Sequence, residues 1–264
     1  MSGLLRRVFV LLASIGPVLI LIYAWEMAGR RDSSAAFFFS YPSQVITDLV
    51  SGLLHGDLVL EAGYTMLPAL AGLVLGALVG GGAGFTLVAA PSLARYLQPL
   101  IAGLGALPVF AIAPMTLVWF GLGLSGKVFL AFLGCVFVFL QAAYKGGQSV
   151  PKRIVSHMTV HGFSPADEFL KVRLPFAADW LAASFKTGAN LALLGVFVGE
   201  FVASEHGLAR VMLNAGALYN VKRVLAAAML FMAVAVIFMT VSELIYRLRI
   251  PLLRRISVSA RIRA

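Results

Sequence analysis

The chain has 264 residues, of which 61% are hydrophobic and only 12% are charged. An ordinary soluble domain carries about 25% charged residues, and so few charges cannot cover so much apolar side chain on a water-exposed surface. This composition excludes a small secreted disulfide protein, a disordered chain and most soluble enzymes. The formal net charge is +10, but the basic residues lie between apolar runs and form no compact face of the kind that binds nucleic acid. We therefore expect an integral membrane protein and no nucleic-acid partner.

Six apolar runs follow one another along the chain, and each approaches or exceeds the length of about 20 residues that crosses a bilayer. They are 8–25, 62–94, 96–126, 128–144, 180–203 and 224–242. The fifth carries Lys186 near one end and Glu200 near the other, where a lysine can extend its ammonium group to the interface. The first follows Arg6 and Arg7, as a signal peptide would, but the lack of a small-residue cleavage site favours a retained helix. We predict an all-α, polytopic membrane protein with about six transmembrane helices.

The distribution of basic residues predicts the orientation of these helices. With the N-terminus in the cytoplasm, the inside segments hold 14 Lys and Arg and the outside segments hold six, in agreement with the positive-inside rule. Both termini are then cytoplasmic, and the longest cytoplasmic loop covers about 145–179. A long connection over 30–61, with a short amphipathic helix expected in it, and a second segment over 204–223 lie outside. Because no low-complexity linker interrupts the chain, residues 1–264 are expected to form a single transmembrane domain.

Four glycines recur at every fourth position of the second run and form one stripe along that helix. They are Gly72, Gly76, Gly80 and Gly84. Small residues at this spacing let two helix backbones approach closely, so we expect a packing groove that carries no information about a solute. The single cysteine, Cys135, lies within an apolar run and is expected to pack against lipid or the protein core.

The third run contains Pro99, Pro108 and Pro114, which predict a kinked or broken helix. Such breaks are tolerated where protein or a water-filled cavity satisfies the freed backbone groups. Two interpretations stay open: a kinked core helix with bulky side chains, or a helix that lines a translocation pathway. The candidate pathway or gate residues are Phe110, Met115, Trp119, Asn190, Phe197 and Glu200.

Glu200 is the acidic residue that looks most buried, and an ionisable group at membrane depth indicates a function by default. We expect a structural or gating role more than direct contact with a solute. Asn190, on the same helix, could donate to an anion or bond a neighbouring helix. His157 and His161 share a helix face, but two histidines without a nearby third ligand are a weak signal, and we expect no metal site. Without a Ser-His-Asp arrangement, a Walker A loop or paired carboxylates in the sequence, we expect no active site and no cofactor bound by this chain.

Residues 156–175 read Ser-His-Met-Thr-Val-His-Gly-Phe-Ser-Pro-Ala-Asp-Glu-Phe-Leu-Lys-Val-Arg-Leu-Pro. Gly162 is suited to end one helix, because glycine adopts the left-handed conformation without strain. Ser164 is suited to cap the next helix, with Pro165 at its first position and Asp167 at its third. The loop therefore predicts a short, capped helix.

This short helix is also amphipathic. Glu168 lies in its first turns, where negative charge is favoured, and Pro175 is expected to end it. The apolar side is formed by Phe169, Leu170 and Val172. On these features alone the helix is either a docking element or a surface helix.

The same stretch resembles the cytoplasmic motif of ABC importer permeases, Glu-Ala-Ala-x3-Gly-x9-Ile-x-Leu-Pro. Gly162, nine further residues and Val-Arg-Leu-Pro at 172–175 reproduce its second half. Ser-His-Met at 156–158 departs from the first half, where Glu-Ala-Ala would stand.

Other segments resemble the taurine, alkanesulfonate and nitrate branch of these permeases. The matching pieces are Leu-Pro at 107–108, Ala-Pro at 113–114, Trp-Phe-Gly-Leu-Gly at 119–123, Lys-Val at 127–128, and Glu200 followed by Gly-Leu at 207–208. Ala209 replaces the last glycine of the final piece. The similarity covers about 41–249, and the order and spacing of the pieces make it specific.

This resemblance implies the fold of a type I ABC importer permease with a cytoplasmic coupling helix, in the inner (plasma) membrane of a bacterium. Two permease copies, a homodimer in the simpler case, form the pathway. Two ATPase subunits, which hold ATP and Mg²⁺, bind the coupling helix. A periplasmic or extracellular solute-binding protein delivers the solute, for which a small anion or a sulfonate- or nitrate-like compound is favoured. The residues that it implies for coupling to the ATPase are Gly162, Ser164, Pro165, Asp167, Glu168, Phe169, Leu174 and Pro175.

The chain itself is then a transport subunit and not an enzyme, but three other functions stay open. A stand-alone secondary transporter or channel needs an ionisable relay in the membrane, for which Glu200 and Glu243 are the candidates. A membrane-embedded enzyme such as a lipid transferase needs a cluster of His, Asp or Glu at one interface. A non-transporting scaffold needs only the glycine stripe.

Overall fold

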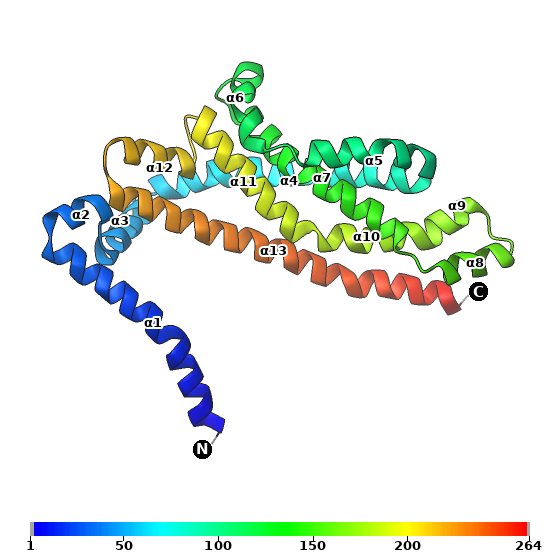
Figure 1. Ribbon diagram of the computed structural model, residues 1–264, viewed down its shortest axis with the longest axis horizontal. Helices are drawn as coiled ribbons and strands as arrows, with labels where there is room; N and C mark the ends of the chain where they lie inside the picture. The colour runs from blue at the N-terminus through cyan, green and yellow to red at the C-terminus, as the bar shows by residue number, and fades with distance from the viewer. Residues whose placement is uncertain (1–2, 263–264) are drawn as a thin grey trace. The chain divides into compact units, whose positions relative to one another are not determined.

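The computed structural model describes the backbone of residues 3–262, and the side chains of that range except those of 3–15, 33, 110, 203 and 245–262. Every element assigned in this range is a helix, so the predicted all-α class is confirmed (Figure 1). The elements are α1 (Gly3–Arg31), α2 (Ser33–Phe39), α3 (Pro42–Leu54), α4 (Asp57–Ala89), α5 (Pro91–Gly105), α6 (Val109–Phe120), α7 (Leu124–Gln148), α8 (Lys152–Val160), α9 (Pro165–Glu168), η1 (Phe169–Arg173), α10 (Leu174–Ala183), α11 (Phe185–Ala203), α12 (Leu208–Ala217) and α13 (Val221–Ile262).

Four helices in the described part of the chain are long and apolar enough to cross a membrane. These stretches are Asp57–Ala89, Leu124–Gln148, Phe185–Val202 and Val221–Leu244. They correspond to the second, fourth, fifth and sixth apolar runs. The first run lies in α1, where the side chains of residues 3–15 are outside the described set. The third run is divided between two shorter helices.

A proline lies at the start of each helix of the third run. α5 begins at Pro91, before the predicted start, because Ala90 leaves the helical conformation (φ −122°, ψ 76°) and a proline at the start of a helix needs no N–H. The helix of the second run, α4, correspondingly ends at Ala89 instead of residue 94, and it begins at Asp57 instead of residue 62. Pro108, in an extended conformation (φ −71°, ψ 121°), separates α5 from α6. Pro99 and Pro114 lie inside helices, so one of the three predicted breaks divides the run.

The chain forms two compact units, residues 1–62 with 208–231 and residues 63–207 with 232–264, and each is described by itself. The expectation of a single domain stays a prediction. In the larger unit α7 is central, because α5, α6, α10 and α11 all pack against it. Its fully buried side chains include Leu130 and Phe139. α7 and α11 approach closely at Gly195, where an added Cβ atom would lie under 3.0 Å from the backbone of Leu130.

The glycine stripe of α4 faces α7. At each of the four glycines, a Cβ atom added to the backbone would lie under 3.0 Å from an atom of α7, and the residues met are Ala131, Cys135, Val136 and Ala143. Cys135 is buried in this contact, with its Sγ 3.6 Å from the carbonyl oxygen of Gly72. The structure thus identifies the partner helix of the stripe, and it places the cysteine in the core.

The smaller unit joins the first three helices to the segment around α12. Arg223 of α13 donates from Nη1 to Oδ2 of Asp48 at 3.2 Å, and its Nη2 pairs with Asp57 at the start of α4. Trp25 of α1 donates from Nε1 to the carbonyl oxygen of Ser40 at 3.1 Å. Side chains from distant parts of the sequence therefore hold this unit together.

Candidate functional site

The segment that resembles the permease motif, which we call the coupling loop (residues 145–179), reverses direction at Gly162. α8 ends at Val160, and Gly162 adopts φ +76°, in the left-handed region that favours glycine. The amide of Phe163 donates to the carbonyl of Met158 at 3.1 Å, and the amide of Gly162 donates to that of Thr159 at 3.1 Å. These bonds satisfy carbonyls that the end of the helix would leave unpaired.

Ser164 caps the next helix, α9. Its Oγ accepts from the amide of Asp167 at 3.2 Å, while Oδ2 of Asp167 accepts from the amide of Ser164 at 3.4 Å and from its hydroxyl at 2.7 Å. This reciprocal arrangement is a capping box. Lys171 lies 2.7 Å from Oδ1 of the same carboxylate. Hydrogen bonds from Lys171 and from Ser164 lower the pKa of Asp167 below its usual value of 3.8.

The prediction that Pro175 ends this helix is wrong. α9 leads directly into a five-residue π-helix, η1, and then into α10, where Pro175 lies in the first turn. The amide of Leu174 donates to the carbonyl of Phe169, five residues earlier. In a regular helix the proline ring would clash with the carbonyl four residues before it. The wider π turn accommodates the ring, so the helical path continues through α10 toward α11.

Arg173 connects this segment to the central helix α7. Its Nε and Nη2 each lie 2.6 Å from Oε1 of Glu168, and its Nη1 donates to the carbonyl of Gly147 in α7 at 3.4 Å. Sequence reasoning missed this role, because the arginine occupies the variable position of the motif. Arg173 therefore joins Glu168, at the end of α9, to the end of α7.

The coupling loop also presents exposed apolar side chains. Val160 is 83% exposed, Leu170 is 59% exposed and Phe163 is 43% exposed. The ammonium group of Lys171 lies 5.1 Å from the centre of the Phe163 ring. Apolar side chains held outward on a capped segment are typical of a surface that a protein partner covers.

A buried ion pair connects α7 and α11 at a second place in the larger unit. Nζ of Lys127 lies 3.7 Å from Oε1 of Glu200, and the two side chains are 5% and 0% exposed. Lys127 also donates to the carbonyls of Tyr64 at 3.2 Å and His206 at 3.1 Å. The rings of Tyr64 and His206 stack with their centroids 4.6 Å apart. Because the ammonium group has an acid and two carbonyls as partners, it can stay charged away from water.

Gly207 helps to enclose Glu200. This glycine has φ +122°, and a Cβ atom at its position would overlap the Glu200 carboxylate. The sequence indicates that Glu200 is buried, but it places Lys127 in an external connection. In the structure Lys127 lies in the first turn of α7. One feature of the sequence could have indicated a buried lysine: Lys127 is the single residue between two long apolar runs.

The other pathway candidates lie on α6 and α11, which pack against each other. Met115 and Trp119 are 53% and 59% exposed, and Asn190 is also exposed. Phe197 is half-buried and stacks on another phenylalanine of α11 at 5.8 Å between centroids. The side chain of Phe110 lies outside the described residues. The exposed candidates therefore face lipid, a second chain or an open pathway.

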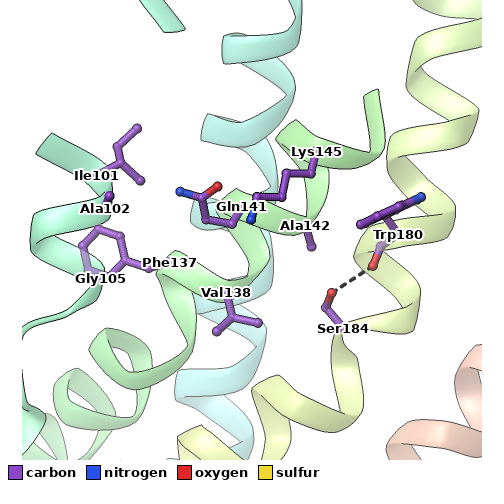
Figure 2. Close-up of a pocket in the computed structure, with 10 residues that line it drawn as sticks. All are labelled: Ile101, Ala102, Gly105, Phe137, Val138, Gln141, Ala142, Lys145, Trp180 and Ser184. Carbon is purple, nitrogen blue, oxygen red and sulfur yellow. Dashed lines mark hydrogen bonds between the residues drawn. The ribbon is translucent and has the colours of Figure 1, made fainter. Parts of the chain in front are cut away.

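A groove of about 470 Å³ lies between α5, α7 and α10, and Figure 2 shows the side chains that line it. Phe137 lies toward one side and Trp180 toward the other, with Gln141 and Lys145 of α7 between them. Gln141 donates from Nε2 to Oε1 of Gln98 at 3.5 Å. The predicted pathway residues are not among the described residues that line this groove. Sequence reasoning missed the glutamine pair, because two amides on separate helices leave no pattern in the sequence.

Comparison with known proteins relates this geometry to a family. Residues 72–255 match the family model of the binding-protein-dependent transport system inner membrane component. The match begins at the first glycine of the stripe and includes the coupling loop and the buried ion pair.

Individual relatives extend the similarity over most of the chain. A probable ABC transporter permease of Haemophilus influenzae is 29% identical, over 86% of this chain and 93% of its own. The putative aliphatic sulfonates transport permease SsuC of Bacillus subtilis is 25% identical over 81% of this chain and 78% of its own. The taurine transport system permease TauC of Escherichia coli is 23% identical over 77% of this chain and 76% of its own.

A solved structure shows the same fold. A chain of the MetNI methionine ABC transporter, in an inward-facing conformation, superposes with a TM-score of 0.61 at 18% identity. The superposition covers 72% of this chain and 95% of that one. The fold is that of a type I ABC importer permease.

Proposed function

The chain belongs to the family of inner membrane components of binding-protein-dependent transport systems, the permease subunits of ABC importers, and we propose that two copies of it form the solute pathway of one such importer. Two ATPase subunits bind the coupling loops and hold ATP and Mg²⁺. A solute-binding protein delivers the solute on the opposite side. The chain crosses the bacterial inner membrane several times, with both termini in the cytoplasm, and it performs no chemistry of its own.

The observation that carries this proposal is the capped segment that begins at Gly162 and continues through Pro175. The capping box fixes its start, and Lys171 and Arg173 hold its two acids in place. The exposed apolar side chains beside it offer a surface for an ATPase cleft. Since Ser-His-Met replaces the acidic start of the motif, contact with the ATPase falls mainly on these apolar side chains.

Helix α7 supports a route for coupling, because its first turn contributes to the ion pair with Glu200 and its last turn binds Arg173. Lys127 lies in its first turn and Gly147, which accepts from Arg173, lies in its last turn. Twenty residues of α-helix span about 30 Å, close to the thickness of the hydrocarbon core. When ATP closes the ATPase subunits, a displaced coupling loop pulls on α7. The opposite end of α7 then moves relative to α11 at the ion pair with Glu200.

The solute class that we propose is a small anion, such as a sulfonate- or nitrate-like compound. The similarity to SsuC and TauC supports this class. Lys127 already pairs with Glu200 and donates to two carbonyls, so an anion in the pathway would compete with these partners for its ammonium group. We therefore expect the binding protein to select the solute, and the pathway to contact it weakly.

The test is purification of the full-length chain in mild detergent, followed by mass spectrometry and an ATPase assay. We expect an ATPase subunit to copurify and to hydrolyse ATP with vanadate sensitivity. Leu170→Asp should abolish this association, whereas Leu122→Asp, at the exposed turn between α6 and α7, should leave it intact. Association that survives Leu170→Asp would contradict the assigned docking surface.

The second candidate is a stand-alone secondary transporter or channel. The buried pair of Lys127 and Glu200 favours it, because ionisable groups inside membrane proteins also serve as relays. This candidate predicts solute flux in vesicles that contain the chain alone. Flux that requires added ATPase and ATP would exclude it.

A further inference from the structure

Three consecutive phenylalanines of α2 are exposed, although they are strongly apolar. The exposed fractions are 53% for Phe37, 63% for Phe38 and 67% for Phe39. The rings of Phe37 and Phe38 meet edge to face, with centroids 5.2 Å apart. A contiguous apolar surface of this kind marks a site that something covers.

A second segment of the smaller unit adds to the same surface. The ring of Tyr219, between α12 and α13, stacks on that of Phe37 with centroids 6.0 Å apart and planes 23° apart. Tyr219 is 68% exposed and the adjacent Leu218 is 80% exposed. We call Phe37, Phe38, Phe39, Leu218 and Tyr219 the aromatic patch.

The backbone holds the aromatic patch in a defined shape. Ser40, which ends α2, has φ +54°, and Tyr219 has φ +56°. This region is unfavourable for side chains other than glycine, and for a bulky tyrosine most of all. The carbonyl of Ser40 accepts from Trp25, and the amide of Asn220 donates to the carbonyl of Ala215 at 2.8 Å. Strain that the surrounding structure maintains points to a function for the side chains it orients.

The position of α2 along the chain indicates what covers the patch. α2 follows α1, where the side chains of Val18–Tyr23 are all exposed and apolar, as on a helix that faces lipid. α1 then ends in Arg30 and Arg31, which are exposed. Aromatic rings that follow the end of an apolar helix are typical of the level of lipid headgroups, on either side of a membrane.

We propose that the aromatic patch inserts into the membrane at the boundary between headgroups and acyl chains, beside the C-terminal end of α1. The occupant of this surface is therefore lipid. The patch contains no charged side chain, and it follows the exposed apolar stretch of α1 along the chain. Arg30 and Arg31, at the end of α1, lie between the two in the sequence, and Arg30 pairs with Glu26 of the same helix. The smaller unit is thereby anchored on the bilayer surface by two segments distant in sequence, α2 and the turn after α12.

A site-specific fluorescent label tests this proposal without a transport measurement. Phe38→Cys and, separately, Phe39→Cys are labelled with bimane in the full-length chain, which is then reconstituted into phosphatidylcholine–phosphatidylglycerol vesicles. The unsubstituted chain measures background labelling, since Cys135 is buried. Val160→Cys is the matched control, because Val160 is 83% exposed in the coupling loop.

At both patch positions we expect quenching by lipids with brominated acyl chains, and a several-fold weaker quenching by aqueous iodide than at Val160. Iodide quenching equal to that at Val160 would overturn the proposal. Protection that arises only when a solute-binding protein is added, or only at high protein density, would assign the patch to a protein partner or to a second copy. Because the readout is independent of ATP and of solute, failure of the proposed import function leaves this result unaffected.

Discussion

The ammonium group of Lys127 and the carboxylate of Glu200 lie 3.7 Å apart, and both are almost completely removed from solvent. Desolvation of two charges is expensive, and their attraction compensates for it only where further hydrogen bonds satisfy the ammonium or the carboxylate. The carbonyls of Tyr64 and His206 supply such bonds to Lys127. The pair therefore ties four segments of the larger unit into one arrangement.

Removal of one partner of this pair should be costly. Lys127→Met leaves the Glu200 carboxylate buried without its cation, and breaking a buried pair in this way costs about 3–5 kcal/mol. The double variant Lys127→Met/Glu200→Gln should regain most of that loss, because no unpaired charge remains. The measurement is the thermal unfolding midpoint in detergent, and equal midpoints for the single and the double variant would contradict the pairing.

The glycine stripe predicts a contrast within one helix. Gly80→Leu places a side chain where an added Cβ atom already overlaps the carbonyl of Val136, whereas Gly82 has open space around it. Overpacking of this kind costs about 1–3 kcal/mol, so Gly80→Leu, like Gly76→Leu, should lower yield and thermal stability. Gly82→Leu is the control and should match the native chain. Equal behaviour of Gly80→Leu and Gly82→Leu would refute the close contact of α4 with α7.

Arg173 should couple the ATPase to the pathway. Arg173→Met removes the bonds to Glu168 and to the carbonyl of Gly147 in α7, while Lys171→Met, the control, removes the ion pair with Asp167 in α9. We expect Arg173→Met to keep ATP hydrolysis and to lose uptake several-fold. The measurement is the amount of solute taken up per ATP hydrolysed, in proteoliposomes that also contain the ATPase. Native uptake for Arg173→Met would exclude coupling through Arg173. Glu168→Arg should uncouple in the same way.

The turn at Gly162 should tolerate little change. Proline fixes φ near −65°, far from the +76° observed, so Gly162→Pro should misdirect α9 while membrane insertion stays intact. We expect normal expression, retained helix content and strongly reduced uptake. Normal uptake at a normal expression level would count against the assignment of this turn to coupling.

The stability of the capping box should depend on pH, because Asp167, one of its two residues, is titratable. Its lowered pKa means that the folded loop favours the ionised carboxylate, so this stabilisation is complete above the usual value of 3.8 and is lost as pH falls through the lower folded pKa. Hydrogen exchange of the amides in α9 should accelerate over that acidic range in the native chain. In Asp167→Asn exchange should already be fast at neutral pH. An unchanged pH profile in that variant would show that Asp167 has no part in the cap.

Local features of the fold could be predicted from the sequence. The helical class follows from composition, and the cap at Ser164 follows from the spacing of Ser164 and Asp167 with Pro165 between them. The close approach of α4 follows from four glycines on one face. In each case, residues within a few turns of one another decide the structure.

Features that depend on distant partners could not be predicted in this way. Lys127 resembles a residue of an external connection until the carbonyls of Tyr64 and His206 are brought to it. A proline ends a helix reliably only where the turn before it is a regular α-helical turn. The turn before Pro175 is a π turn, so the helix continues past this proline. Arg173 occupies a position that no motif constrains, and its role requires the end of α7 beside it.

Arg223 sets the order in which the smaller unit can assemble during synthesis. Asp57, one of its two acidic partners, leaves the ribosome 166 residues earlier. At translation rates of about 5–20 residues per second, the first three helices wait roughly 8–33 s for the arginine that closes their unit. During that interval they need the insertion machinery or the bilayer surface as a temporary partner. The smaller unit is therefore completed late in synthesis, after most of the chain has been made.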